Sequence, residues 1–310
     1  MHRWSRTALP LTLLLTACGT GTEPEGSAPA AEAPESAPAA MQESAAPPAT
    51  SEIGALLLTA TTGDHRSEAN IARNDARHPV ETLTFLGLTP ESTVVEVWPG
   101  AGGWYTEVLA PVLRESSQLV VADYSTESES EYRAGSAQRF ADKLASAPEV
   151  YDAAEVVAFE PPALASLGEA GSADFVFIPR NYHNFIAGEI EDDVLAAAFE
   201  VLRPGGVLGI VQHREPEDAP PETEVRDGYV KESVVIADAE AAGFVLEAKS
   251  EVNANPADTA DHEAGVWTLP PTLTTCREIE DPEEKAACAE PFLAIGESDR
   301  MTLKFVKPEA

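Results

Sequence analysis

The stretch best suited to chemistry is a glycine-rich turn between a strand-like and a helix-like segment. Residues 94–97 are Val-Val-Glu-Val, a β-branched run typical of a buried strand, and an apolar pattern of helical period begins at Thr106. Between them lie three glycines, Gly100, Gly102 and Gly103. Glycine lets the backbone approach a ligand closely, and a helix N-terminus offers unpaired N–H groups. The turn therefore predicts a site for a nucleotide-like ligand.

Two further residues narrow the choice of ligand. Asp123 ends the next predicted strand, 23 residues beyond Gly100. An acidic residue near that spacing can accept hydrogen bonds from ribose hydroxyls. The dinucleotide fingerprint G-x-G-x-x-G needs a third glycine for close packing of helix on strand, and Tyr105 holds that position. We therefore expect a nucleoside ligand other than a dinucleotide.

The turn also carries a family resemblance. Residues 96–102, Glu-Val-Trp-Pro-Gly-Ala-Gly, resemble the E/D-x-G-x-G-x-G motif of class I S-adenosylmethionine-dependent methyltransferases, with Trp98 in place of the first glycine. Residues 202–208, Leu-Arg-Pro-Gly-Gly-Val-Leu, resemble the turn that precedes the fifth strand of that family. Two further stretches resemble those of a group of bacterial predicted methyltransferases. They are WPGAGGWY at residues 98–105 and RNYHN at residues 180–184.

This resemblance covers roughly residues 65 to 250, and its implications are specific. It implies a Rossmann-like, doubly wound α/β fold with a mostly parallel, seven-stranded sheet. It implies S-adenosyl-L-methionine as the cofactor of a methyltransferase whose acceptor the sequence does not identify. The cofactor-binding residues that we expect are Glu96, Trp98, Gly100, Gly102, Asp123 and Asn181.

Two histidines are the candidate catalytic residues. His183 follows the predicted strand at 173–178, and His213 follows the one at 207–212. Ligands in such sheets bind outside the carboxyl ends of the strands, so neighbouring strands would bring both rings near the cofactor. There they could act as a general base for the acceptor, or they could anchor the loops by hydrogen bonds. No third ligand stands at a metal-binding spacing, so we predict no metal site.

Aromatic and basic residues near the turn leave alternatives open. Trp98, Trp104 and Tyr105 could stack on an adenine or simply pack in the core. Arg77 lies before the first strand, in a segment that folds over the cofactor in many methyltransferases. Its guanidinium could instead pair with one of the many carboxylates. Tyr229 is a weaker candidate for the acceptor side.

These residues are positioned by a regular alternation of strands and helices, which predicts a mostly parallel sheet with helices on both faces. A short apolar segment at 53–61 precedes it. Helices are expected at 66–86 (interrupted at 74–79), 106–113, 131–146, 192–202 and 231–242, and strands at 94–97, 118–122, 154–159, 173–178, 207–212, 244–252 and 301–306.

Residues 253–300 are expected to form an irregular lid or insertion. Long loops in compact domains are usually lids, binding loops or disordered. Cys276 and Cys288 lie in this segment, and two cysteines in an oxidising compartment usually pair. We therefore predict a disulfide between them, and together with Trp267 it argues against disorder.

The N-terminal residues predict export and lipidation. Residues 1–17 have a basic start and an apolar run at 8–17, as in a signal peptide. The run ends in Leu15-Thr16-Ala17-Cys18, which resembles the lipobox of bacterial lipoproteins, and this implies a lipid on Cys18. Residues 18–52 would be a disordered Ala/Pro/Glu-rich tether, and residues 53–310 the methyltransferase-like domain. Gly19 favours the outer membrane, on its periplasmic side.

The charge balance restricts the partners. The chain has 53 acidic and 20 basic residues, a net charge of −33. Phosphate backbones and anionic membranes attract Lys and Arg, so we expect no nucleic-acid partner and membrane contact only through the lipid anchor. The partner that we expect is therefore a methyl acceptor that is either a small molecule or a component of the cell envelope. The sequence does not determine the oligomeric state. The alternative to an enzyme is a non-catalytic binding lipoprotein that retains the methyltransferase fold.

Overall fold

The central element is an eight-stranded sheet. The computed structural model describes residues 51–220 and 227–309. Seven strands follow the order β3-β2-β1-β4-β5-β8-β7, and β6 pairs with β5 beside that path. The first five strands are parallel, while β8 is antiparallel to β5 and β7. The strands are β1 (Val94–Val97), β2 (Leu119–Asp123), β3 (Glu155–Ala158), β4 (Ala173–Pro179), β5 (Leu202–Glu215), β6 (Val230–Lys231), β7 (Val245–Ser250) and β8 (Arg300–Val306).

Helices cover both faces of this sheet, as the alternation of elements predicts. One hydrophobic core lies under α8, α9 and α10, and the other under α1, α4, α5 and α6. The helices are α1 (Glu52–Thr61), α2 (Glu68–Ile71), α3 (Asn74–Arg77), α4 (Pro79–Leu86), α5 (Thr106–Leu113), α6 (Glu131–Ser146), α7 (Pro148–Tyr151), α8 (Tyr182–Ala187), α9 (Glu191–Val201), α10 (Glu232–Ala241), α11 (Thr274–Arg277) and α12 (Pro282–Ile295), with the 3-10 helix η2 (Gly265–Thr268).

Alternation along β1 explains why both faces are apolar. Side chains of a strand point to opposite faces in turn. Val95 and Val97 accordingly belong to the core under α9, whereas Val94 belongs to the core under α5. All four residues of β1 are buried, including Glu96. A central parallel strand of this kind places its carboxyl end, and therefore the glycine turn, at the middle of one edge of the sheet.

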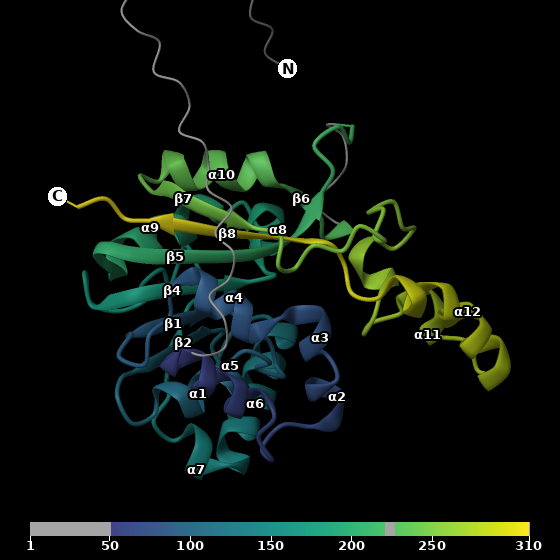
Figure 1. The fold of residues 1–310 in the computed structure, drawn as a ribbon, viewed down its shortest axis with the longest axis horizontal. Coiled ribbons are helices and arrows are strands. Elements are labelled where there is room, and N and C mark those ends of the chain that lie inside the picture. Colours follow the sequence, from purple (N-terminus) through teal and green to yellow (C-terminus); the bar gives the residue numbers. More distant parts are fainter. Residues whose placement is uncertain (1–50, 221–226, 310) are drawn as a thin grey trace, which may run out of the picture. The chain divides into compact units, whose positions relative to one another are not determined.

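The sheet reverses its winding between β1 and β4. Strands β2 and β3 lie on one side of β1, and β4 and β5 continue on the other. The chain that leaves β1 and the chain that leaves β4 therefore diverge and open a crevice at their carboxyl ends. Figure 1 shows these strands side by side, with α11 and α12 beyond that end.

The segment before β1 is more broken than a single interrupted helix. It forms the three short helices α2, α3 and α4. His78 separates α3 from α4 in a left-handed conformation, with φ 40°. The residue before a proline is sterically excluded from helical geometry, and Pro79 follows it. This turn directs Arg73 and Arg77, on or beside α3, toward the carboxyl edge of the sheet.

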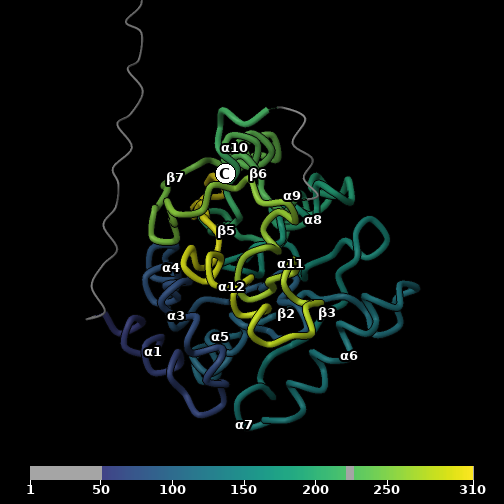
Figure 2. Tube along the Cα trace, turned by 90° about the vertical axis from the view of Figure 1, so that its right-hand side faces the viewer, coloured from purple at the N-terminus to yellow at the C-terminus, as the bar shows by residue number. Residues whose placement is uncertain are grey.

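Residues 253–299 differ from the irregular segment expected from sequence. They contain η2, α11 and the 14-residue helix α12. Asp281 caps α12 by accepting hydrogen bonds from two backbone N–H groups, and Pro282 occupies its first turn. The structure joins Cys276 to Cys288 in a disulfide between α11 and α12. Figure 2, viewed from that end, shows both helices in front of the strand ends.

Some predictions concern residues that the structure does not describe. The signal peptide (residues 1–17), the lipidated Cys18 and all of the tether but Ser51 and Glu52 lie outside the described residues. Within 51–220 and 227–309, no helix is long and apolar enough to cross a membrane.

Candidate functional site

A cavity of about 370 Å³ opens at the switch point of the sheet. Its floor is the glycine turn after β1 and the chain after β4, and its walls come from α3, from η2 and the residues after it, and from the residues just before β8. Such crevices at the carboxyl ends of parallel strands are the usual ligand sites of doubly wound sheets. The lining includes Arg73, Arg77, Trp98, Gly100, Gly102, Gly103, Trp104, Arg180, Asn181, His183, His213, Trp267, Glu297 and Ser298.

The glycine turn presents bare backbone to this cavity. Gly100 adopts φ +72°, a conformation that glycine enters without steric cost. A Cβ on Gly100 or Gly102 would meet no atom within 4 Å, so open space lies over both. The turn is closed by a bond from Gly103 N to Gly100 O of 3.0 Å, after which α5 begins. The predicted close approach of a ligand to this backbone is sterically available.

The indole of Trp98 closes the part of the crevice nearest β2. Trp98 Nε1 donates to the Phe159 carbonyl oxygen at 3.0 Å. The indole centroid lies 4.7 Å from the Tyr124 ring and 4.8 Å from the Phe185 ring, and the residue is 4% exposed. Its φ is +49°, unusual for a bulky side chain and natural for the glycine of the motif. Trp98 contributes to the cavity wall, but its ring packs in the hydrophobic core. It does not present an exposed face on which an adenine could stack.

The two predicted acidic residues are buried and do not line the cavity. Asp123 is 1% exposed, and neither carboxylate oxygen has a hydrogen-bond partner among the described residues. Burial raises its pKa to about 6. Glu96 accepts a 2.6 Å hydrogen bond from the Thr106 hydroxyl, and burial raises its pKa to about 7. Unpaired buried carboxylate oxygens are rare in proteins and suit two hydroxyl donors that the chain does not supply.

Asn181 organises the open side of the crevice. Its side-chain amide donates to the carbonyl oxygens of Trp98 at 2.6 Å and of Pro179 at 3.1 Å. These bonds tie the end of β4 to the turn after β1. Asn181 thus holds the two walls of the cavity together, and it also lines the cavity.

His183 and His213 are adjacent, as the predicted neighbourhood of their strands requires. Their ring centroids lie 5.7 Å apart, and β4 pairs with β5. Gln212 Oε1 accepts from the Tyr182 N–H at 3.1 Å, which places the amide nitrogen 3.2 Å from His183 Nδ1. Gln212 Oε1 also lies 3.4 Å from Nδ1, so this ring can carry its proton on either nitrogen. Burial lowers the pKa of His183 to about 4.

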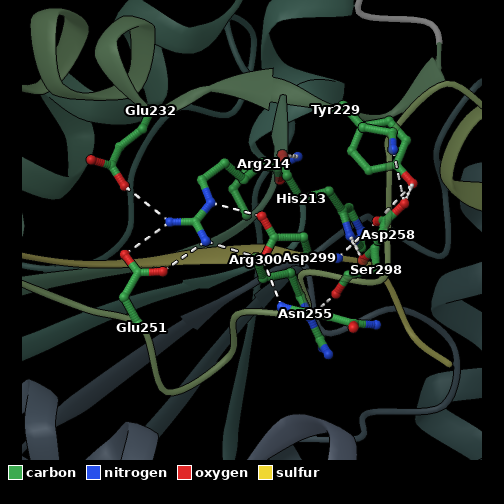
Figure 3. A network of polar contacts seen from close by, with 12 residues as sticks. His213, Arg214, Tyr229, Glu232, Glu251, Asn255, Asp258, Ser298, Asp299 and Arg300 are labelled. Carbon is green, nitrogen blue, oxygen red and sulfur yellow. Dashed lines mark hydrogen bonds and ion pairs between the residues drawn. The ribbon is translucent and has the colours of Figure 1, made fainter. Parts of the chain in front are cut away.

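His213 has a different partner. Its Nδ1 shares a 2.5 Å hydrogen bond with the hydroxyl of Ser298, which Figure 3 shows from close by. A hydroxyl both donates and accepts, so this ring can carry its proton on either nitrogen. Burial, with the neighbouring His183 second, lowers the pKa of His213 well below its ordinary value. Both imidazoles are therefore neutral near pH 7.

A cluster of guanidinium groups surrounds the histidines. Arg77 stacks 4.6 Å from the centroid of Trp104, and its Nε donates to Glu297 at 3.0 Å. Arg73 and Arg300 also pair with Glu297, at 2.6 and 3.3 Å. Arg180, with φ +61°, is pinned by a 2.6 Å bond from its backbone N–H to the Val211 carbonyl. We call Arg73, Arg77, Arg180 and Arg300 the arginine cluster.

A second arginine site lies beyond His213 and is fully paired. Arg214 donates to Asp299 at 2.8 Å and to Glu251 at 2.7 Å, and Glu232 lies 3.7 Å away (Figure 3). These carboxylates raise the pKa of Arg214. The weaker candidate Tyr229 is buried close by and donates to Asp258 at 3.0 Å, which makes it part of this network.

Sequence reasoning missed most of the polar cavity wall. Arg180 belongs to the segment RNYHN after β4, but the sequence pattern predicts no role for its charge. It also predicts no role for Arg73, Arg300, Glu297 or Ser298. Arg73 and Glu297 are 224 residues apart, so no local spacing links them. The one available signal was that several of only 20 basic residues fall at element ends. In the described ranges, no group of three or more His, Cys, Asp or Glu side chains is arranged to hold a metal ion.

Comparisons with known proteins address the fold. No family model matches the sequence, and no curated protein matches it. The solved structure of the [4+2]-cyclase SpnF matches with TM-score 0.51 at 15% identity, over 83% of this chain and 93% of that chain. The geranyl diphosphate C-methyltransferase of Streptomyces coelicolor A3(2), solved with Mg²⁺, geranyl diphosphate and S-adenosyl-L-homocysteine, matches with TM-score 0.50 at 14% identity, over 80% and 87%.

At sequence identities of 14% and 15%, these matches establish a similar fold and not a shared function. The chain has the Rossmann-like fold of class I methyltransferases. This confirms the predicted fold class. The roles of the predicted site residues stay predictions.

Proposed function

We propose that this protein is an S-adenosylmethionine-dependent methyltransferase that acts on a small-molecule or envelope acceptor. The observation that carries the proposal is the bare glycine turn, which faces a ligand-sized cavity at the switch point of the sheet. One solved structure of similar fold is a C-methyltransferase that holds S-adenosyl-L-homocysteine, which supports the same cofactor here.

The residues present fit this cofactor once one side chain moves. Open space over Gly100 and Gly102 suits its methionine end, and the two unpaired oxygens of Asp123 suit a ribose. Asp123 is 1% exposed and does not line the cavity, so we infer that the Trp98 indole has to turn away for the nucleoside to bind. When bound, the cofactor supplies an electrophilic methyl group on a sulfonium.

The protein's own part in the reaction is to hold and deprotonate the acceptor. Asn181 keeps the walls of the cavity at a fixed separation, and the neutral imidazole of His183 lines the same cavity. With Nδ1 of His213 donating to Ser298, its Nε2 is unprotonated and can accept a proton from the acceptor. Trp267 lies 5.8 Å from the His183 ring and, with the residues after η2, limits entry of water.

Calorimetry of the purified protein with S-adenosylmethionine and S-adenosylhomocysteine tests the proposal. We expect micromolar binding that Asp123→Ala abolishes. Asp152→Ala, which alters a surface carboxylate paired with Arg114, is the matched control and should bind as the wild type does. Binding weaker than millimolar, unchanged by Asp123→Ala, would contradict the proposal.

A second candidate function is a non-catalytic binding protein with this fold. The packing of Trp98 favours it, because the buried indole bonds to Phe159 and Asp123 is absent from the cavity lining. One structural neighbour is a [4+2]-cyclase, so a similar fold also occurs in a protein named for another reaction. Failure of the calorimetric test, with a ligand still bound in the cavity, would select this second function.

We also propose that the protein is a lipoprotein of the cell envelope, on the strength of Leu15-Thr16-Ala17-Cys18 and the preceding apolar run. Metabolic labelling with a radioactive fatty acid should mark the wild type and not Cys18→Ala. Fractionation should place the labelled protein in the outer membrane. Label retained by Cys18→Ala would contradict the assignment.

A further inference from the structure

The cavity carries positive charge that the protein does not neutralise. Glu297 is the one carboxylate that pairs with the arginine cluster within the described residues, and it contacts Arg73, Arg77 and Arg300. Glu96 also feels the charge of Arg180, but burial raises its pKa to about 7. Even with both carboxyls ionised, four guanidinium groups leave two positive charges unmatched.

The donors of this cluster are also left without acceptors. Arg77 is 1% exposed and lines the cavity, yet its Nη1 and Nη2 are buried without a hydrogen-bond partner among the described residues. Nε of Arg180 is buried and unpartnered as well, and no ion pair of its guanidinium occurs there. A guanidinium presents five N–H donors, and leaving them unsatisfied away from water is costly. Burial together with the neighbouring guanidinium groups lowers the pKa of Arg77.

This arrangement contrasts with the rest of a protein whose net charge is −33. Elsewhere carboxylates are abundant, and Arg214 alone contacts three of them. Among the described residues no carboxylate forms an ion pair with Arg180, and Glu297 acts on its charge only from a greater distance. The groups that face Arg180 and Arg77 inside the cavity are Glu297, which also pairs with Arg73 and Arg300, together with two neutral imidazoles, the Trp104 and Trp267 rings, and backbone.

We propose that the arginine cluster binds a dianionic group, a phosphate or an equivalent pair of carboxylates, of the small molecule that occupies this cavity. Guanidinium groups bind such anions through paired N–H donors. The neutral imidazole of His183 lines the same cavity. The volume of about 370 Å³ admits a small molecule rather than a polymer.

The assignment of this anion to the methyl acceptor rests on the proposed function. S-adenosylmethionine has one carboxylate against a sulfonium and an ammonium, so it brings net positive charge. It cannot neutralise the cluster, and its binding would be aided by an anion already there. The methyl acceptor, rather than the methyl donor, therefore supplies the dianion.

Inorganic phosphate is the probe for the test, with acetate as the singly charged comparison, both titrated by calorimetry at constant ionic strength. We expect submillimolar phosphate binding and at least tenfold weaker acetate binding. Arg180→Gln should weaken phosphate binding at least tenfold. Arg203→Gln, which removes an exposed arginine paired with Asp174 at the amino end of β5, should leave it unchanged. Absence of phosphate binding, or equal loss in both variants, would overturn the proposal.

Thermal unfolding separates binding from a role in the fold. Because the Arg180 guanidinium has no ion pair or hydrogen bond with the described residues, Arg180→Gln should unfold at the wild-type temperature or above it without ligand. A fall of several degrees would show that Arg180 stabilises the ligand-free fold, contrary to the proposal.

Titration of phosphate in saturating S-adenosylhomocysteine distinguishes the two sources of the anion. Undiminished or tighter phosphate binding supports an acceptor dianion. Competition between the two ligands would show that the cluster serves the carboxylate of the donor, and it would overturn the acceptor assignment. Phosphate binding that depends on Arg180, in a protein that does not bind S-adenosylhomocysteine, would uphold the anion site and refute the methyltransferase.

Discussion

The two halves of the carboxyl edge of the sheet are built in opposite ways. At the β1–β2 half, Asp123 and Glu96 are buried with raised pKa values, and the buried Trp98 indole donates to the Phe159 carbonyl. At the β4–β5 half, the residues after the strands face an open cavity with guanidinium groups and two neutral histidines. The two acidic motif residues thus lie in the closed half, whereas Gly100 and Gly102 face the ligand-sized cavity that continues into the open half.

This difference shows how one substitution relocates a binding crevice. A glycine at position 98 would remove an indole that packs against Tyr124 and Phe185. With Trp98 in place, the cavity extends over Gly100 and Gly102 to His213, and Asp123 is not part of its lining. A variant in one half leaves the other half unaltered, so the unaltered half serves as an internal control.

Trp98→Gly has the largest expected effect. Removing a buried indole costs about 3–5 kcal/mol of unfolding free energy, partly offset because glycine adopts the positive φ of this position freely. The same change opens the path to Asp123, so we expect calorimetry to show at least tenfold tighter binding of S-adenosylhomocysteine.

Trp98→Phe is the control for that variant. It removes the Nε1 donor to Phe159 but keeps a ring in the gap, so affinity should stay near the wild-type value. Unchanged or weaker binding by Trp98→Gly would mean that the indole belongs to the ligand site and does not block it.

His183→Gln tests the open half through its pH dependence. The pKa of His183 is lowered to about 4 in the folded state, so the folded protein binds fewer protons than the unfolded chain between pH 6.5 and 4. Stability is therefore lost as the pH falls through that window, by about 2–3 kcal/mol for this residue. Urea unfolding at pH 7 and pH 4.5 should show a smaller loss in His183→Gln. An NMR titration that gives His183 an ordinary pKa would refute the explanation.

Asp123→Asn tests the closed half, where the pH dependence of stability has the opposite sign to that of His183. The pKa of Asp123 is raised to about 6, so the folded state binds more protons than the unfolded chain between about pH 4 and 6. Stability falls as the pH rises through this window, and Asn removes the penalty, by about 2 kcal/mol at pH 7.5 and not at pH 4. Asp152→Asn at the surface should bring no such gain. Equal gains for Asp123→Asn at both pH values would exclude titration as the cause.

Gly102→Ala has the smallest effect on stability. Its φ lies outside the left-handed region and a Cβ meets nothing within 4 Å, so reduced freedom of the unfolded chain should add about 0.5 kcal/mol. The added methyl nevertheless enters the ligand space, and binding of S-adenosylhomocysteine should weaken several-fold. Gly135→Ala in α6 is the matched control, with a similar gain in stability and full affinity. Full affinity in Gly102→Ala would show that no ligand approaches this backbone.

Local periodicity was enough to predict much of the fold. The boundaries of β1, α5 and α6 agree with the predicted ranges, because each element has a clear apolar period and ends at residues that break it. α8 was missed because Arg180 to Asn184 is a polar string after a strand, which is typical of a loop. α12 was missed because the Ala- and Glu-rich residues 282–295 have little apolar periodicity, and only Ala289 is buried among them.

The candidate site was predictable only in part. The strand order placed His183 beside His213, because parallel neighbours end at the same edge. The arginine cluster was not predictable, since Arg77 and Glu297 are 220 residues apart and meet only when α3 and β8 reach the same edge of the sheet.

The sequence by itself determined the order of strands and helices, the glycine turn after β1 and the excess of negative charge, because each of these is a local or compositional property. Only the tertiary structure decided which way Trp98 points. Its three neighbours, Tyr124, Phe159 and Phe185, follow three different strands, and no spacing along the chain encodes their distance from one another. The positive charge inside the cavity likewise depends on long-range packing. It brings Arg73, Arg77 and Arg300 into contact with Glu297 and places Arg180 near the same carboxylate.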